Sequence, residues 1–197
     1  MAITKEQIQE LRERTGCGML DCKKALEESN GDMEKAVEQL RKKGAAIAAK
    51  RGGNKTAEGL VHAYIHPGAQ VGVLLEINCE TDFVARTESV IQFAQDICLH
   101  IAAMKPLYLR SEDVDQKFLE HEKTIIQAQL AESGKPEKIV AQIADGKLKK
   151  IVNDICLLQQ PFVKNDQLTV DDVLKALIAK IGENIVIRRF VRYEIGL

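Results

Sequence analysis

The residues best suited to chemistry or recognition meet in one short stretch, Leu74–Thr87, which reads LLEINCETDFVART. It holds a thiol, Cys79, beside the acids Glu80 and Asp82. A thiol nucleophile is one interpretation, but acidic neighbours raise a thiol pKa, and no histidine is close to Cys79 in the sequence. A buried, unreactive cysteine is therefore favoured. An enzyme built around Cys79 is kept as an alternative, and alkylation of that thiol would abolish its activity.

The same stretch ends in Phe83, in a chain whose aromatic residues make up only 4% of the total. A polar corner followed by one large apolar side chain has the form of an anchor residue that fills a pocket in a partner. The alternative is a phenylalanine folded back onto its own hairpin, since Phe is often buried. Asp82 also has two interpretations, a helix cap or a hydrogen bond to the partner.

Other residue types give little support for a metal or cofactor site. The chain has five cysteines, an odd number at unmatched spacings, which predicts reduced thiols in place of a disulfide framework. His62 and His66 are four residues apart on a predicted strand and its turn, a geometry that does not stack them as a metal pair. We expect no cofactor and no bound metal.

Charge and hydropathy narrow the classes of partner. The formal net charge is -1, so the chain lacks the basic footprint that drives binding to a phosphate backbone. Apolar runs stay well short of a membrane span, and the N-terminus MAITKEQIQE resembles no leader peptide. We expect a cytoplasmic protein that contacts neither nucleic acid nor membrane directly.

Residues that cap and end helices predict a three-helix module over residues 1–44. Thr4 and Gln7 form a capping box that begins the first helix, and Gly16 ends it. The second helix closes at Asn30-Gly31, and the third runs from a cap at Asp32 to Gly44. Residues 45–55, AAIAAKRGGNK, are predicted to form a linker. Its basic residues Lys50, Arg51 and Lys55 are interpreted as a solvated tether, with a phosphate-binding patch as the alternative.

Residues 56–197 are predicted to form an α+β core with a small three-stranded antiparallel sheet packed with helices. Two alternating segments, 60–65 and 71–78, form a hairpin around Pro67-Gly68, and residues 185–195 alternate as a third strand. Between them, one helix carries Cys98 on its core side. Strand edges left in solvent favour a homodimer through this core.

The intervening helices are delimited by glycine, proline and capping residues. Ser111 is predicted to open a helix that Gly134 ends, and Pro136 to begin the next one, which Gly146 interrupts. A last helix begins at Thr169 with Asp172 and ends at Gly182.

Five blocks of the sequence, in this order over nearly its full length, resemble the bacterial translation elongation factor Ts family. They are LRERTGCGMLDCKKALEESNGDMEKAVEQLRKKG, AEGLVHAYIH, EINCETDFVAR, CLLQQPFVKN and RRFVRYEIG. The chain is similar to the short, homodimeric form of the family. Departures are small: Cys17 stands where the family usually has alanine, and Leu20 where methionine is frequent.

The resemblance implies a UBA-like N-terminal module and a guanine-nucleotide exchange factor that binds elongation factor Tu and releases its GDP. It implies no catalytic residues in this chain, which would act on a partner GTPase without being an enzyme. An alternative is a UBA-like adaptor on a dimeric scaffold without exchange activity.

The resemblance also assigns residues to the partner surface. The T-D-F-V motif, Thr81, Asp82, Phe83 and Val84, would push its phenylalanine between helices of the partner and dislocate Mg²⁺ from the nucleotide site. Other partner-binding residues would be Arg12, Met19, Leu20, Asn78, Cys79 and Glu80. From helical periodicity alone, Met19 and Leu20 could instead pack the second helix against the first.

Overall fold

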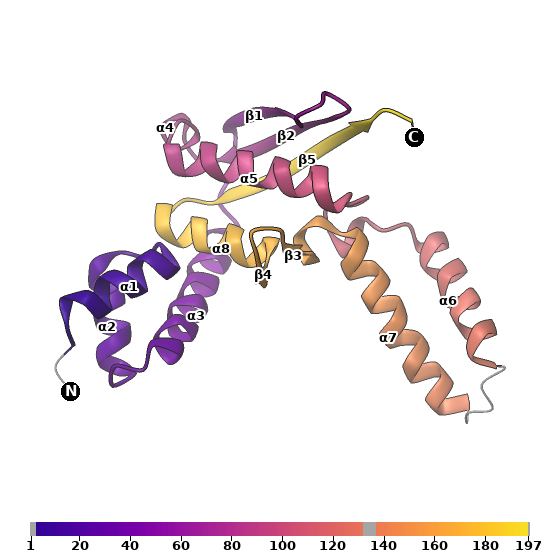
Figure 1. Ribbon diagram of the computed structural model, residues 1–197, viewed down its shortest axis with the longest axis horizontal. Coiled ribbons are helices and arrows are strands. Elements are labelled where there is room, and N and C mark those ends of the chain that lie inside the picture. The colour runs from indigo at the N-terminus through magenta and orange to yellow at the C-terminus, as the bar shows by residue number, and fades with distance from the viewer. Residues whose placement is uncertain (1–2, 132–136, 197) are drawn as a thin grey trace. The chain divides into compact units, whose positions relative to one another are not determined.

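The computed structural model describes residues 3–131 and 137–196 (Figure 1). The chain divides into two compact units. The first comprises Met1–Leu99 and Asp171–Leu197, and the second comprises His100–Val170. The predicted division into residues 1–44, 45–55 and 56–197 stays a prediction.

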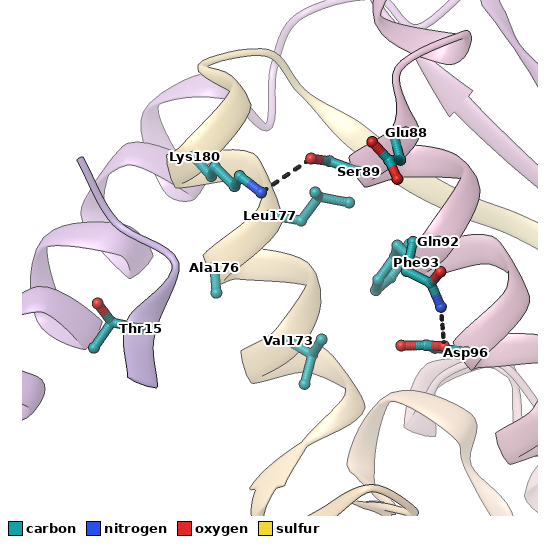
Figure 2. Close-up of a pocket in the computed structure, with 10 residues that line it drawn as sticks. All are labelled: Thr15, Glu88, Ser89, Gln92, Phe93, Asp96, Val173, Ala176, Leu177 and Lys180. Carbon is teal, nitrogen blue, oxygen red and sulfur yellow. Dashed lines mark hydrogen bonds between the residues drawn. The ribbon is translucent and has the colours of Figure 1, made fainter. Parts of the chain in front are cut away.

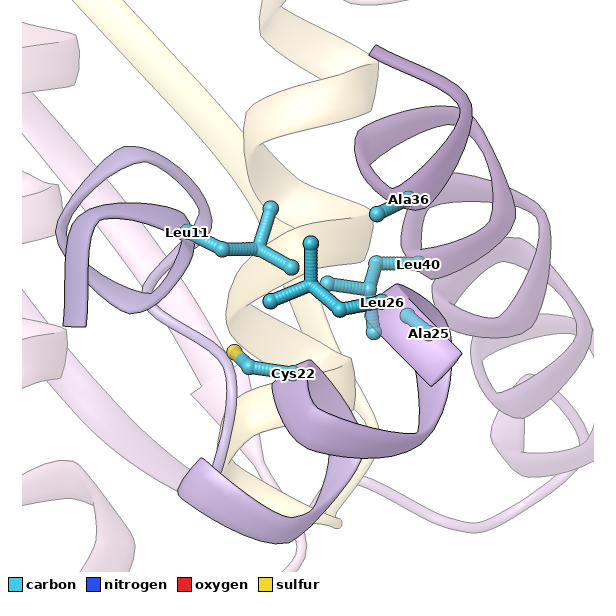
Figure 3. Close-up of a cluster of buried hydrophobic side chains, with 6 residues drawn as sticks. All are labelled: Leu11, Cys22, Ala25, Leu26, Ala36 and Leu40. Atoms are coloured by element: carbon cyan, nitrogen blue, oxygen red, sulfur yellow. The ribbon is translucent and has the colours of Figure 1, made fainter. Parts of the chain in front are cut away.

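Three helices begin the chain: α1 (Lys5–Thr15), α2 (Met19–Glu28) and α3 (Met33–Arg51). The predicted capping box is confirmed, because the Thr4 hydroxyl accepts from the Gln7 amide and the Gln7 side chain accepts from the Thr4 amide. Gly16 ends α1 in the left-handed conformation, with φ 67°. The apolar sides of the helices meet in one buried cluster (Figure 3), formed by Leu11, Cys22, Ala25, Leu26, Ala36 and Leu40.

The predicted end of the third helix at Gly44 is wrong, since α3 continues to Arg51. Gly44 is buried, and a Cβ atom built on it would lie 3.4 Å from the Cβ of Ala179 in α8 (Val170–Ile181). Glycine therefore serves close helix packing here. Residues 45–51 of the predicted linker are helical.

The expected three-stranded antiparallel sheet is confirmed, with strand order β1-β2-β5. Its strands are β1 (Glu58–Ile65), β2 (Val71–Cys79) and β5 (Ile185–Glu194). Helix α5 (Glu88–Met104) lies along one face (Figure 1), where Gln95 hydrogen-bonds His62 over 2.8 Å. This face is the core, with side chains buried on both elements. They include Val73, Leu75, Ile77, Cys79, Ile185 and Ile187 of the sheet and Val90, Phe93, Ala94 and Ile97 of α5.

The regular alternation predicted for residues 185–195 is wrong at one point, because β5 contains a bulge. Glu76 pairs with Arg189 and the adjacent Ile77 pairs with Ile187, which leaves Arg188 as the extra residue. A bulge moves all later side chains to the other face. Ile187, which precedes the bulge, is buried, whereas Tyr193, which follows it, is exposed.

The second unit contains two long helices, α6 (Gln116–Ala131) and α7 (Glu137–Ile155). Ile126 and Leu130 of α6 form a buried cluster with Ala144 of α7. This packing holds α7 together through Gly146, so the predicted interruption there is wrong. The predicted end of one helix at Gly134 and the predicted start of the next at Pro136 lie outside the described residues.

Short elements of the second unit differ from the prediction. Ser111 opens only a 3₁₀ turn, Ser111–Asp113, before α6 begins. After the 3₁₀ turn Leu157–Gln159, strands β3 (Pro161–Phe162) and β4 (Asn165–Thr169) form a small antiparallel pair that was not predicted. Cys98, whose predicted core position on α5 is confirmed, has a pKa that burial raises to about 12.

Candidate functional site

The site is built around a four-residue helix, α4 (Asp82–Ala85), which follows the end of β2. Thr81 caps it in an extended conformation, and its hydroxyl accepts from the Val84 amide over 3.4 Å. Ala85 turns inward and is buried, while the Phe83 side chain is 81% exposed. This corner of the chain, residues Thr81–Val84, therefore presents its one large apolar side chain to solvent.

These positions decide two of the alternatives left open by the sequence. A phenylalanine folded back onto its hairpin is wrong, because Phe83 is among the most exposed apolar residues of the described chain. Asp82 is not the cap, since Thr81 has that role. Asp82 lies in the first turn and forms an ion pair with Arg86 over 3.1 Å.

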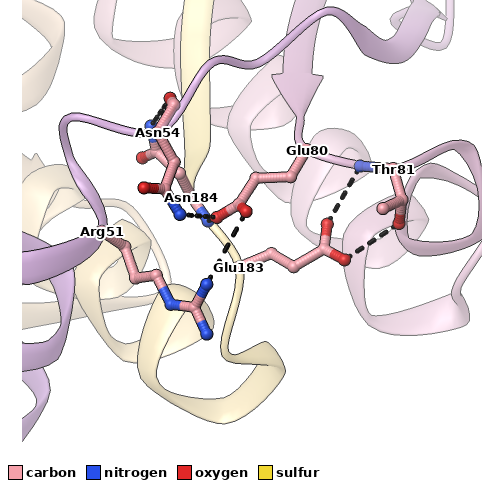
Figure 4. Close-up of polar contacts among 6 residues, drawn as sticks. All are labelled: Arg51, Asn54, Glu80, Thr81, Glu183 and Asn184. Carbon is pink, nitrogen blue, oxygen red and sulfur yellow. Dashed lines mark hydrogen bonds and ion pairs between the residues drawn. The ribbon is translucent and has the colours of Figure 1, made fainter.

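Glu183 braces the corner from a segment 102 residues away in the sequence (Figure 4). The Thr81 amide donates to Glu183 Oε2 over 3.1 Å, and the Thr81 hydroxyl donates to Oε1 over 2.9 Å. Glu183 lies between α8 and β5, directly after Gly182, whose φ of 82° lets the chain turn there. The carboxylate thus receives both polar hydrogens of the residue that caps α4.

Glu80 is the centre of a second set of polar contacts, also drawn in Figure 4. Its Oε1 accepts from the Asn184 amide over 2.6 Å and from the Asn54 side chain over 3.0 Å, and Arg51 lies 3.7 Å from Oε2. The Asn184 amide hydrogen bond, with help from Asn54 and Arg51, lowers the pKa of Glu80. Asn184 also donates to the Asn54 carbonyl over 2.9 Å. Glu80, predicted to bind the partner, is thus already engaged within the chain.

The other two residues predicted in the stretch before the corner lie on β2. Cys79 is fully buried, and its thiol donates to the Thr81 carbonyl over 3.0 Å. Burial, followed by the charge of Glu183, raises the pKa of Cys79, which disfavours the thiolate that a nucleophile needs. Asn78 is half-buried and donates to the Glu58 carbonyl over 3.3 Å. The Cys79 bond supports the corner directly, whereas the Asn78 bond joins β2 to β1.

The N-terminal residues predicted to bind the partner lie on the outside of the three-helix module. Met19 and Leu20, the first residues of α2, are 59% and 76% exposed. Their alternative role of packing α2 against α1 is wrong, since Leu11 and Leu26 fill that position (Figure 3). Arg12 is exposed near the end of α1. This second surface is apolar with a positive charge on the neighbouring helix.

A groove of about 450 Å³ lies between α5 and α8 in the same unit, with Thr15 at the end of α1 on its border (Figure 2). Its floor is apolar, and Lys180 donates to Ser89 over 3.0 Å while Gln92 donates to Asp96 over 2.7 Å. The groove is lined by Thr15, Glu88, Ser89, Gln92, Phe93, Asp96, Val173, Ala176, Leu177 and Lys180. One end of the groove reaches α1 of the three-helix module, and one wall is α5, the helix that follows α4.

Residues 3–131 and 137–196 hold neither a set of metal ligands nor a membrane-spanning helix. In these ranges, no three His, Cys, Asp or Glu side chains come together as a group that could hold a metal ion. His62 bonds Gln95, and His66 bonds the Tyr64 hydroxyl over 2.9 Å. Within the same ranges, none of the helices combines the length and apolar character that crossing a membrane requires.

Sequence reasoning found the corner and the exposed apolar residues but missed the residues that brace them. Glu183 and Asn184 were absent from the prediction, as were Arg51 and Asn54 as contacts of the corner. The polar triplet Gly182-Glu183-Asn184 before a strand was the available signal. Its pairing with residues a hundred positions earlier has no signature in a single sequence.

Comparisons with known proteins cover almost the whole chain. A family profile described as Elongation factor TS matches residues 4–196. The chain is 58% identical over 194 residues to Elongation factor Ts of Carboxydothermus hydrogenoformans, covering 98% of this chain and 89% of the relative. It is 56% identical to that of Desulfitobacterium hafniense, with the same coverage. To that of Moorella thermoacetica it is 55% identical, covering 98% and 96%.

Proposed function

Because the chain belongs to the elongation factor Ts family, we propose that it is a guanine-nucleotide exchange factor for elongation factor Tu. In translation elongation it binds the GDP form of that GTPase and promotes GDP release, so that GTP can bind. It catalyses no covalent step. The observation that carries the proposal is Phe83, 81% exposed on a capped and braced corner.

Exchange follows from the linkage between two binding equilibria. A factor that binds the nucleotide-free GTPase more tightly than the GDP form weakens GDP binding by the same free energy. Insertion of the corner Thr81–Val84 disturbs the magnesium site of the partner, where the ion neutralises phosphate charge. Loss of that neutralisation favours departure of GDP.

The corner supplies a limited part of the effect. Complete burial of one Phe side chain contributes about 1.5 to 3 kcal/mol, which corresponds to roughly 10- to 150-fold. A larger acceleration needs further contacts. We assign these to the exposed Arg12, Met19 and Leu20 on the N-terminal module. Cys79 and Glu80 then contribute by supporting the corner, and the half-buried Asn78 contributes as a partner contact beside it.

We also propose a homodimer through the α+β core. The face of the sheet opposite α5 exposes apolar side chains of all three strands, namely Val61, Ile65, Leu74, Val191 and Tyr193. Exposed patches of this kind mark interaction sites, and a second copy would bury the same face on both chains. This open face supports the dimer more directly than the strand edges do.

The dimer is tested by placing charges on the open face. Leu74→Lys is expected to lower the molar mass measured by sedimentation equilibrium toward that of one chain. Phe83→Ala is the control, because Phe83 lies outside this face, and it is expected to retain the dimer mass. A monomeric wild type, or a Leu74→Lys variant that remains dimeric, would contradict the assigned face.

Exchange is tested by the release of fluorescent GDP from elongation factor Tu. Wild type is expected to accelerate release, and Phe83→Ala to lose roughly 10- to 150-fold of that acceleration. Leu107→Ala is the matched control, since Leu107 is 66% exposed in the other unit. Equal rates for wild type and Phe83→Ala would remove the role of Phe83. No acceleration by wild type would favour the UBA-like adaptor without exchange activity.

A further inference from the structure

We propose that Glu183 is a positioning residue for the exchange reaction, holding the Thr81–Val84 corner in the orientation that projects Phe83. The inference rests on the proposed exchange function and assigns to it a residue outside the T-D-F-V motif. Glu183 acts through Thr81, and its side chain need not touch the partner.

The contacts show how the carboxylate controls the direction of α4. Thr81 lies between the end of β2 at Cys79 and the start of α4 at Asp82. Its backbone therefore sets the angle between the strand and the helix. Glu183 receives the Thr81 amide over 3.1 Å and the hydroxyl over 2.9 Å. The hydroxyl hydrogen points to Glu183, which leaves an oxygen lone pair to accept from the Val84 amide. One carboxylate therefore orients the cap as well as the corner.

The rest of the corner cannot supply the same control. Ala85 is buried and Val84 half-buried, and the Thr87 hydroxyl donates to the Val84 carbonyl over 2.8 Å, but these contacts hold the body of α4 and not its cap. The Cys79 thiol is only a weak donor to the Thr81 carbonyl. Helix α4 has only four residues, too short to be stable by itself. Hydrogen bonds to a charged acceptor are stronger than those between neutral groups. The two bonds to Glu183 are thus stronger than the neutral hydrogen bonds of the corner, and they act directly on the residue that caps α4.

The position of Glu183 is itself fixed by the residues before and after it in the chain. Gly182 ends α8, and the amide of Asn184 donates to Glu80, the residue before Thr81. Two hydrogen bonds therefore continue the pairing of β2 with β5 beyond the last residue pair, Cys79 and Ile185. Thr81 donates to Glu183, and Asn184 donates to Glu80. A side chain held on such a platform loses little conformational freedom on binding.

Removing the brace lowers the fraction of molecules whose Phe83 points outward, and the apparent efficiency of exchange falls with that fraction. Glu183→Gln replaces one acceptor oxygen with an amide that cannot accept, so Thr81 loses one of its two bonds. We expect about a 10-fold lower maximal rate of GDP release, the scale of one hydrogen bond to a charged group. The half-saturating concentration should change little, because the N-terminal contact is intact.

The experiment measures GDP release from elongation factor Tu against concentration of factor for wild type, Glu183→Gln, Phe83→Ala and the double variant. The control is Glu28→Gln, which removes an exposed glutamate at the end of α2. If Glu183 acts through Phe83, the double variant is no slower than Phe83→Ala. Full additivity of the two losses, or a Glu183→Gln maximal rate equal to wild type, would overturn the inference.

A second measurement is independent of the partner. Hydrogen–deuterium exchange of the α4 amides in the free protein should be faster in Glu183→Gln than in Glu28→Gln, while the amides of α5 stay protected. Unchanged α4 exchange would overturn the positioning role. Failure of wild type to accelerate GDP release would instead overturn the exchange function, whatever the α4 amides show.

Discussion

Replacing His100 with glutamine is expected to remove part of the pH dependence of the stability. His100 is fully buried in the second unit and fixed as one neutral tautomer. Its Nδ1 accepts from the Val163 amide over 3.2 Å, so the ring hydrogen lies on Nε2 and is donated to Gln160 over 2.8 Å. Gln160 in turn donates to the carbonyl of Asp154 over 2.6 Å. A proton on Nδ1 would lie directly opposite the hydrogen of the Val163 amide, so the charged ring would lose this hydrogen bond.

Burial, only partly offset by the Gln160 hydrogen bond, lowers the pKa of His100. Above the unfolded pKa of about 6.5, both states are neutral and the full stability is present. As the pH falls below that value, the unfolded chain binds a proton that the folded chain does not, and stability is lost. The limiting slope is about 1.4 kcal/mol per pH unit, which gives at most about 1 kcal/mol between pH 6.5 and 5.5.

The assay is urea unfolding at pH 7.5, 6.5 and 5.5, followed by circular dichroism. Carboxylates titrate in every variant, so the informative quantity is the difference in slope between wild type and His100→Gln. His121→Gln is the matched control, because His121 is exposed on α6 of the same unit. Parallel pH profiles for wild type and His100→Gln would refute the reasoning, as would a flattened profile in the His121 variant.

Three further substitutions or modifications test the packing. Gly59→Ala should lower the free energy of unfolding in urea by about 2 kcal/mol or more, because the added methyl group would overlap the carbonyl oxygen of Ile77 in β2. Gly53→Ala is the control and should cost far less, because the space around Gly53 is open. A maleimide reagent should label the native protein at Cys17, the one partly exposed thiol of the five, and mass spectrometry of labelled peptides would contradict this by finding a buried cysteine modified first. Leu26→Ala should cost about 2 to 5 kcal/mol of unfolding free energy, whereas Leu20→Ala on the surface should cost within about 0.5 kcal/mol; equal losses would contradict the assigned burial.

Features set by neighbouring residues could be predicted from the sequence. The Thr4 cap, the Gly16 stop and the hairpin around residues 66–70 depend on interactions over a few positions, and the structure has all three. The corner at Thr81 was also readable, because a polar run interrupts an alternating strand. Its exposed phenylalanine could not be settled from the residues alone, since composition favours burial of Phe.

Features set by distant packing could not be predicted. Gly44 carries the pattern of a helix end, yet its neighbour is Ala179, 135 positions later, and the helix continues past it. The bulge at Arg188 reverses the exposure of the last strand residues without a glycine or proline to mark it. Glu183 reads as an ordinary surface acid until Thr81 is placed beside it. Each case needs the position of a second segment.

The cost of leaving Phe83 exposed explains why the chain braces the corner so firmly. Burial of that side chain is worth about 1.5 to 3 kcal/mol, which the free protein leaves unrealised. A loosely held corner would collapse onto nearby apolar surface and use that free energy in folding. With Thr81 held by Glu183, the proposed function would leave that free energy for contact with the partner, and little of it would be lost to ordering the Phe83 side chain. Leu20 is likewise exposed, on the first turn of α2, whose Leu26 lies in the buried cluster of the three-helix module. Under the proposed function, two anchors on one unit make the second contact intramolecular once the first has formed, so the N-terminal surface would supply affinity while the corner acts on the nucleotide site.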